Sequence, residues 1–143
     1  MKKLILAVLG ILLFATACNK MDGKSTGEPA GKVLQNKTWR MTGYYEEEVD
    51  RLIYFTGYAF TFKDDGSIFA KRDSVEVYGS YKDTLYQDTL AVPSLKLDFG
   101  AGRPFDKINR NWQVVSKTTK EIHLRMKDRL SDPYSHIFFR INY

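Results

Sequence analysis

The feature that most constrains the fold of this chain is a two-residue alternation of apolar and polar side chains. Leu95, Leu97 and Phe99, for example, alternate with Lys96 and Asp98. Successive side chains of a β-strand point to opposite faces, so this period predicts strands with one buried and one exposed face. The same pattern recurs along most of the chain, which predicts an all-β fold.

About eight strands of this kind are expected. They fall at residues 39–45, 58–63, 67–71, 75–82, 94–99, 111–117, 122–127 and 137–142. Asp65-Gly66 separates two of them and is a strong hairpin signal, because a type I′ turn needs positive φ at both central residues. Sequential strands with short turns predict an antiparallel meander that closes into a barrel or folds into a sandwich. One or two short helices are expected, at residues 46–55 and 104–109.

The N-terminus has the layout of a secretory signal peptide. Lys2 and Lys3 form a positive region, residues 4–14 form an apolar region, and small residues lead to Cys18, the only cysteine. A cysteine at the expected cleavage position resembles the lipobox of bacterial lipoproteins. The resemblance implies that the Cys18 thiol takes a diacylglycerol and that Cys18 becomes the first residue of the mature protein.

Two other interpretations of the N-terminus stay open. One is an ordinary cleaved signal with a chance cysteine nearby, and the other is a transmembrane anchor. The apolar run of residues 4–17 is shorter than the roughly 20 residues that span a bilayer, which argues against an anchor. A single cysteine allows no disulfide within the chain, so the fold has to be held by its hydrophobic core.

The remaining chain is expected to form one domain behind a linker. Residues 1–17 are assigned to the signal peptide and the polar, Gly-, Ser- and Lys-rich residues 18–34 to a flexible tether. Residues 35–143 are assigned to the folded domain. Removal of Lys2 and Lys3 leaves 20 basic and 17 acidic residues, a mild balance that argues against nucleic acid as a partner.

Four segments, read in order behind the lipobox, resemble the lipocalin-like small lipoproteins of Bacteroidetes: residues 58–67, 79–81, 95–100 and 111–116. The resemblance implies a lipocalin-like barrel at the outer membrane or cell envelope, in a family mostly without assigned biochemical function.

The chain also departs from vertebrate lipocalins. Their first strand carries Gly-x-Trp, whereas Lys37 stands two residues before Trp39, and the later motif reads Gly79-Ser80-Tyr81. Their ligand contacts are therefore not transferred to this chain. The resemblance implies the barrel architecture and, with it, a ligand-binding cavity inside the barrel, here called the cup.

Inward-facing aromatic residues are the candidates for a ligand site. Trp39, Tyr58, Phe60, Tyr81 and Trp112 would line a cup for a small apolar or amphipathic ligand. Eight strands enclose an interior that side chains can fill or that can hold one small ligand. So many large residues favour the filled interior. The Tyr58 and Tyr81 hydroxyls would be the polar contacts, because a buried phenol usually needs a partner.

Catalytic and metal chemistry is not indicated. The acidic run of residues 46–48 does not have the spacing of an EF-hand loop. His123 falls on the polar face of its strand and His136 precedes the last strand, whereas zinc needs three or four converging ligands. Neither histidine accompanies a nucleophile motif. We therefore expect no enzyme activity, no cofactor and no metal.

The sequence as a whole predicts a monomeric, lipid-anchored binding module of the cell envelope. Its partners would be the membrane, through acylated Cys18, and a small hydrophobic ligand or an envelope protein. The alternative is an interaction or inhibitor module that uses the barrel surface and loops around a filled interior. Tyr44, Tyr45, Tyr54 and Phe55 would then form an exposed apolar patch. The membrane leaflet stays open.

Overall fold

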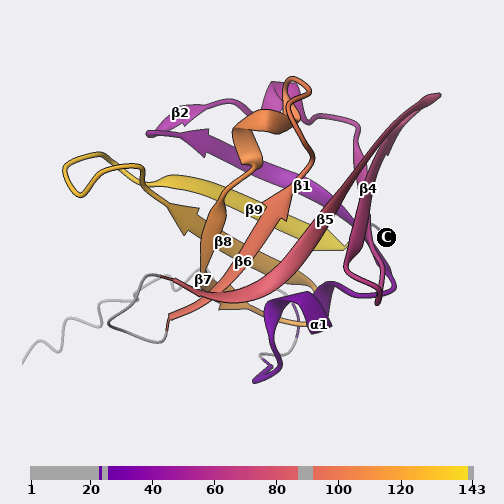
Figure 1. Cartoon of the computed structure of the whole chain (residues 1–143), viewed down its shortest axis with the longest axis horizontal. Coiled ribbons are helices and arrows are strands. Elements are labelled where there is room, and N and C mark those ends of the chain that lie inside the picture. Colours follow the sequence, from indigo (N-terminus) through magenta and orange to yellow (C-terminus); the bar gives the residue numbers. More distant parts are fainter. Residues whose placement is uncertain (1–22, 24–25, 87–91, 142–143) are drawn as a thin grey trace, which may run out of the picture.

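A computed structural model of the chain describes residues 23, 26–86 and 92–141. The predicted signal peptide, Cys18 and most of the predicted tether lie outside the described residues. The described part is a closed antiparallel barrel of eight strands with one extra short strand, a short helix and two 3-10 turns (Figure 1). This confirms the all-β fold predicted from the alternation, and of the two arrangements that the alternation left open it is the barrel.

The strands follow one another around the barrel in chain order. They are β1 (Lys37–Glu46), β2 (Val49–Asp50), β3 (Ala59–Phe62), β4 (Ser67–Arg72), β5 (Val75–Tyr86), β6 (Val92–Asp98), β7 (Asn111–Lys117), β8 (Glu121–Met126) and β9 (Ser135–Ile141). β1 pairs with β3, each later strand pairs with the next, and β1 with β9 closes the barrel. β2 extends the sheet only at the far end of β1.

Three short helical elements complete the fold: α1 (Ala30–Leu34), η1 (Leu52–Tyr54) and η2 (Phe105–Ile108). The two 3-10 turns lie inside the segments where short helices were predicted. α1 was not predicted, because its residues were assigned to the flexible tether. Val33 and Leu34 are buried, and the indole nitrogen of Trp39 donates a hydrogen bond to the Leu34 carbonyl at 3.0 Å. The folded part therefore begins before residue 35.

The tight turns differ from the prediction in type. Of the Asp65-Gly66 pair only Gly66 has positive φ, and its N–H donates to the Lys63 carbonyl. This is a type I turn that ends in a left-handed glycine, the usual three-residue hairpin loop. Two consecutive residues with positive φ occur instead at Glu47 (49°) and Glu48 (72°), between β1 and β2.

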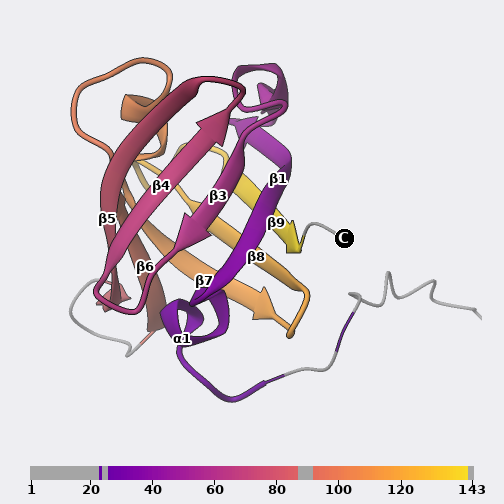
Figure 2. The same ribbon diagram turned by 90° about the vertical axis from the view of Figure 1, so that its right-hand side faces the viewer.

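The two ends of the barrel are built differently (Figure 2). α1 covers one end, beside the turn between β3 and β4. The other end, here called the mouth, carries the β1–β2 hairpin, η1, residues 99–110 with η2, and residues 127–134 between β8 and β9. Among the described residues, no helix is long and apolar enough to cross a membrane.

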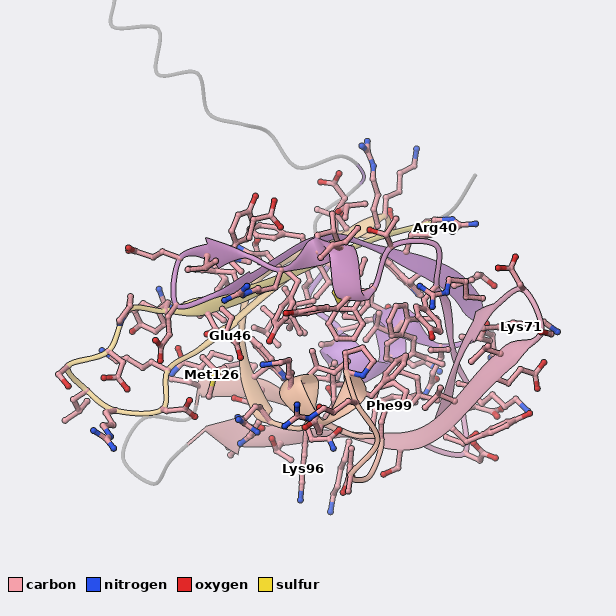
Figure 3. All side chains as sticks on the ribbon, turned by 90° about the horizontal axis from the view of Figure 1, so that it is seen from above. Arg40, Glu46, Lys71, Lys96, Phe99 and Met126 are labelled. Carbon is pink, nitrogen blue, oxygen red and sulfur yellow. The ribbon has the colours of Figure 1, made fainter. Side chains whose placement is uncertain are left out.

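Aromatic rings pack against one another along the barrel interior. Phe105 of η2 contacts the rings of Phe55, Tyr58 and Phe99, with ring centroids 5.5, 5.1 and 4.9 Å away. Deeper in the barrel, Phe60 packs edge-to-face on Phe139 at 5.2 Å. Viewed from above, labelled side chains such as Phe99 point inward, whereas Lys71 and Lys96 point out (Figure 3).

Candidate functional site: a charged pocket at the barrel mouth

The five side chains predicted to line a cup are all buried. Their exposed fractions are 0% for Trp39 and Phe60, 1% for Trp112, 5% for Tyr58 and 7% for Tyr81. The Trp112 indole donates to the Ile108 carbonyl at 2.9 Å, and the Tyr81 hydroxyl donates to the Lys63 carbonyl. Four of the five therefore belong to the packed interior, and Trp112 also forms part of a pocket at the mouth.

That pocket has a volume of about 250 Å³ and opens among β1, η2 and the start of the β8–β9 loop. Its apolar wall is formed by Tyr44, Trp112 and Met126, which are all buried. Small-molecule sites of proteins typically measure about 300–1,000 Å³. The mouth pocket, at about 250 Å³, lies just below that range and therefore fits only a small ligand.

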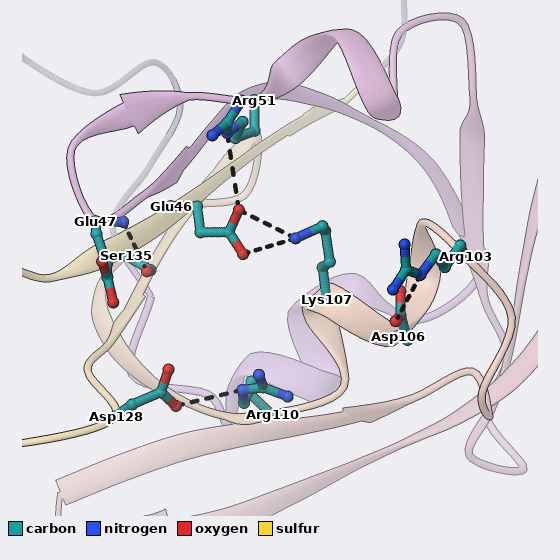
Figure 4. Close-up of polar contacts among 9 residues, drawn as sticks. All are labelled: Glu46, Glu47, Arg51, Arg103, Asp106, Lys107, Arg110, Asp128 and Ser135. Atoms are coloured by element: carbon teal, nitrogen blue, oxygen red, sulfur yellow. Dashed lines mark hydrogen bonds and ion pairs between the residues drawn. The ribbon is translucent and has the colours of Figure 1, made fainter.

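Charged side chains form the rim of the pocket (Figure 4). Lys107 Nζ donates to both carboxylate oxygens of Glu46, at 3.0 and 3.2 Å, and Arg51 Nε lies 3.8 Å from the same carboxylate. On the opposite side, Arg110 Nε lies 3.5 Å from Asp128 Oδ1. These ion pairs connect the η2 segment to β1 on one side and to the β8–β9 loop on the other.

The local sequence explains why these charges face the pocket. Side chains two apart on a strand share a face, so Glu46 follows the inward-facing Tyr44. Residues three apart in a 3-10 helix lie above one another, so Phe105 and Ile108 are buried together. Lys107 then lies on a different side of η2, where it reaches Glu46.

Tyr44 is 1% exposed and supplies a polar group to the pocket wall. Burial raises the pKa of its phenol far above the ordinary value, and the negative charge of Glu46 raises it further. The phenol therefore stays protonated at neutral pH. Within the part of the chain that the structure describes, nothing hydrogen-bonds its hydroxyl. This donor is left for water or for a bound molecule, because a buried phenol usually has a partner.

Arg51 provides a buried donor without a partner. Its Nε is buried without a hydrogen-bond partner among the described residues, since 3.8 Å to Glu46 is too long for a hydrogen bond. Buried polar groups without partners are uncommon in proteins and call for an explanation. An acceptor atom of a bound molecule or of water would satisfy the Arg51 donor at this pocket.

Sequence reasoning found only part of this site. Trp112 was among the predicted residues, and Glu46 was noted only as part of an acidic run. Lys107 on the short η2 helix and Arg110 and Asp128 in loops were missed, because these segments show no periodicity. Tyr44 had been assigned to an exposed patch together with Tyr45, Tyr54 and Phe55. Tyr45 and Tyr54 are indeed exposed. Tyr44 and Phe55 are only 1% exposed, so the prediction of an exposed patch was wrong for these two residues.

The two histidines, which were predicted separately, lie side by side on the outside of the barrel. His123 Nε2 and His136 Nδ1 are 2.9 Å apart. Burial, together with the smaller effects of the nearby His136 and Arg125, lowers the pKa of His123 from 6.5 to about 4. The pKa of His136 is also lowered, first by burial and then by Arg125.

This pair predicts a loss of stability in acid. Below an ordinary histidine pKa of about 6.5 the unfolded chain binds more protons than the folded one, so the free energy of unfolding falls as the pH drops from about 6.5 towards 4. Because the ring is half exposed, we expect the loss to be about 1 kcal/mol. Urea unfolding at about pH 7 and pH 4.5 measures it, with His123→Gln as the comparison. Equal pH profiles for both proteins would contradict the prediction.

Comparison of the chain with protein-family models, with curated proteins and with solved structures gives no match.

Proposed function

We propose that this protein is a lipid-anchored, non-enzymatic binding module of the cell envelope. Its ligand would be a small amphipathic molecule that carries an acidic group, and its site would be the mouth pocket. The observation that carries the proposal is the combination of an apolar wall, three basic side chains interspersed with three acidic ones, and the unsatisfied Arg51 Nε around one opening of about 250 Å³.

The chemistry of the pocket favours an acidic group over a neutral one. Arg51, Lys107 and Arg110 come from separate places in the chain and meet at one rim. In the structure, the Glu46 carboxylate accepts two hydrogen bonds from Lys107 and lies beside Arg51. A carboxylate or sulfonate of a ligand would make the same kind of charge-assisted hydrogen bonds, which are stronger than neutral ones. Its apolar part would lie against Trp112.

The position of the pocket is consistent with a lipid anchor at Cys18. The described chain enters the barrel at α1, at the end opposite the mouth (Figure 2). An anchored barrel with this connection would hold its mouth away from the bilayer, open to solutes of the surrounding compartment.

Loss of a basic side chain from the rim tests the proposal. We expect Lys107→Ala and Arg110→Ala each to weaken binding of anilinonaphthalene sulfonate, an anionic amphipathic dye, about tenfold, because each removes one charge-assisted contact. Fluorescence titration of the purified protein measures this. Lys32→Ala on the outside of α1 is the matched control, since it removes an exposed lysine at the other end of the barrel. Equal affinity in Lys107→Ala and Lys32→Ala would contradict the proposal.

A natural ligand is sought by native mass spectrometry of protein that has been extracted gently from membranes. A bound acidic molecule of small mass, lost in Lys107→Ala, would support the proposal. Absence of any such molecule, together with no dye binding at the mouth, would count against ligand binding.

A second candidate function is a protein-interaction module. It is favoured by exposed apolar side chains next to the mouth, where Ile53 is 74%, Val49 49% and Tyr45 and Tyr54 each 37% exposed. In that case Ile53→Asp would abolish binding of an envelope protein, while Lys107→Ala would leave it unchanged.

A further inference from the structure

The outer surface of β8 and β9 brings together the only two histidines of the chain. His123 pairs in register with Phe138, and His136 with Arg125, so the histidines are diagonal neighbours on adjacent antiparallel strands. Their facing atoms, Nε2 of His123 and Nδ1 of His136, are 2.9 Å apart. The pair lies on the barrel wall outside the mouth pocket, so it does not depend on the proposed function.

The surroundings hold both rings in place. The His123 ring stacks on the Phe138 ring, with centroids 4.1 Å apart and planes 15° apart. The His136 ring lies 6.2 Å from Phe138 and 6.2 Å from Tyr134. Both histidines are partly buried and sit on strands that are paired along their length. The two nitrogens are therefore positioned by the sheet and not by a loop.

We propose that His123 and His136 form a binding site for one divalent transition-metal ion, with Cu²⁺ bound most tightly. Metal–imidazole bonds of about 2.0–2.1 Å that meet at about 90–110° hold their nitrogen atoms about 2.9–3.4 Å apart. The observed 2.9 Å lies within this range. Turning of the two rings out of their hydrogen-bonded orientation would direct both lone pairs at one ion. Imidazole suits Cu²⁺, Ni²⁺ and Zn²⁺, and affinity for a given site is highest for Cu²⁺.

The proton balance of this step is simple. In the free protein one imidazole donates its N–H to the facing nitrogen of the other. A metal ion binds the neutral form of imidazole, and burial, which lowers the pKa of each ring, favours that form. When the ion binds, the donated hydrogen moves to the other nitrogen of the same ring. Both facing nitrogens then offer lone pairs, and no net proton is released.

Neighbouring charges set the strength of the site. Arg125 lies next to His136 and opposes a cation, whereas the negative charge of Glu48 acts on His136 in the opposite direction. Among the described residues, no group of three or more His, Cys, Asp or Glu side chains converges on one point. Water therefore completes the coordination, and we expect a dissociation constant in the micromolar range, weaker than that of three- or four-ligand zinc sites.

Calorimetric titration with CuCl₂ tests the proposal. The full chain in detergent is used, with Cys18→Ser in every sample so that the only thiol does not bind copper. We expect one Cu²⁺ per chain at the pair, at least tenfold weaker binding in His123→Gln and in His136→Gln, and weaker binding of Zn²⁺ by the reference protein. Arg125→Gln is expected to tighten Cu²⁺ binding severalfold, because it removes the opposing charge.

Unchanged Cu²⁺ binding in both glutamine variants would overturn the proposal, because the metal would then be held elsewhere. Thermal unfolding of each variant confirms that it is folded. The electron paramagnetic resonance spectrum of the reference protein gives an independent readout. Hyperfine coupling to two nitrogen atoms is expected, and a spectrum without nitrogen coupling would overturn the proposal even if the variants failed to fold.

Discussion

Replacing Phe105 with alanine is expected to lower the free energy of unfolding by about 3–5 kcal/mol, as large-to-small changes of buried aromatic residues typically do. Phe105 is 1% exposed and contacts Phe55, Tyr58, Phe99 and, at 6.2 Å, Phe60. These rings come from two segments of the chain, residues 55–60 and the residue directly after β6. Removal of the Phe105 ring leaves a cavity that the paired strands cannot close, and the edge-to-face contacts of this ring are lost as well.

Urea or guanidinium unfolding, followed by tryptophan fluorescence, measures the change. Leu130→Ala is the matched control, because Leu130 is 92% exposed and its truncation is expected to change stability by no more than about 0.5 kcal/mol. A loss below about 1 kcal/mol in Phe105→Ala would mean that η2 does not anchor the mouth through this ring. Since Lys107 lies on η2, dye binding at the mouth is expected to weaken together with stability.

The strands could be predicted from the sequence because a strand's period is local. Leu95 and Leu97 reveal their shared face whatever they pack against. Barrel closure could not be chosen over a sandwich in this way, since both arrangements need the same alternation. Closure depends on the pairing of β1 with β9, at opposite ends of the folded chain, and on the register shift between Met41 and Gly43. Neither the pairing nor the register shift changes the two-residue alternation of apolar and polar side chains, so the alternation does not reveal them.

α1 was missed for a different reason. Val33 and Leu34 are its main apolar side chains, and five residues are too few to show a helical period. Their surroundings are polar, so composition assigned them to the tether. Burial against the barrel overrides that preference, and the hydrogen bond from Trp39 to the Leu34 carbonyl fixes the helix to the first strand.

The candidate sites depend on contacts between distant segments. The inward position of Glu46 could be deduced from Tyr44, because both lie on one strand face. Lys107 and Asp128 reach the pocket only because the loops after β6 and β8 end at the same side of the barrel. The histidine pair likewise depends on the pairing register of β8 and β9. This register could not be predicted, because the sequence does not reveal the shape of the loop between the two strands.

Replacing Cys18 with alanine is expected to abolish lipid attachment completely. The chain contains no other thiol, so the variant has no group from which a thioether to diacylglycerol can form. In cells grown with labelled fatty acid, the label on the wild-type protein is expected to be strong and that on Cys18→Ala to be at background. Ser25→Ala, in the same predicted tether, is the control and is expected to be labelled like the wild type.

The intact mass of the wild-type protein separates the three interpretations of the N-terminus. A chain that begins at Cys18 and carries a diacylglycerol supports the lipoprotein. An unmodified chain that begins near Cys18 indicates an ordinary cleaved signal, and a chain that still begins at Met1 indicates an uncleaved anchor. Each buried CH₂ group contributes about 0.8 kcal/mol to membrane binding, and two acyl chains give stable attachment where one does not. Either unlipidated mass would therefore refute the lipid anchor. The barrel would then be free in solution or held by its uncleaved N-terminal segment.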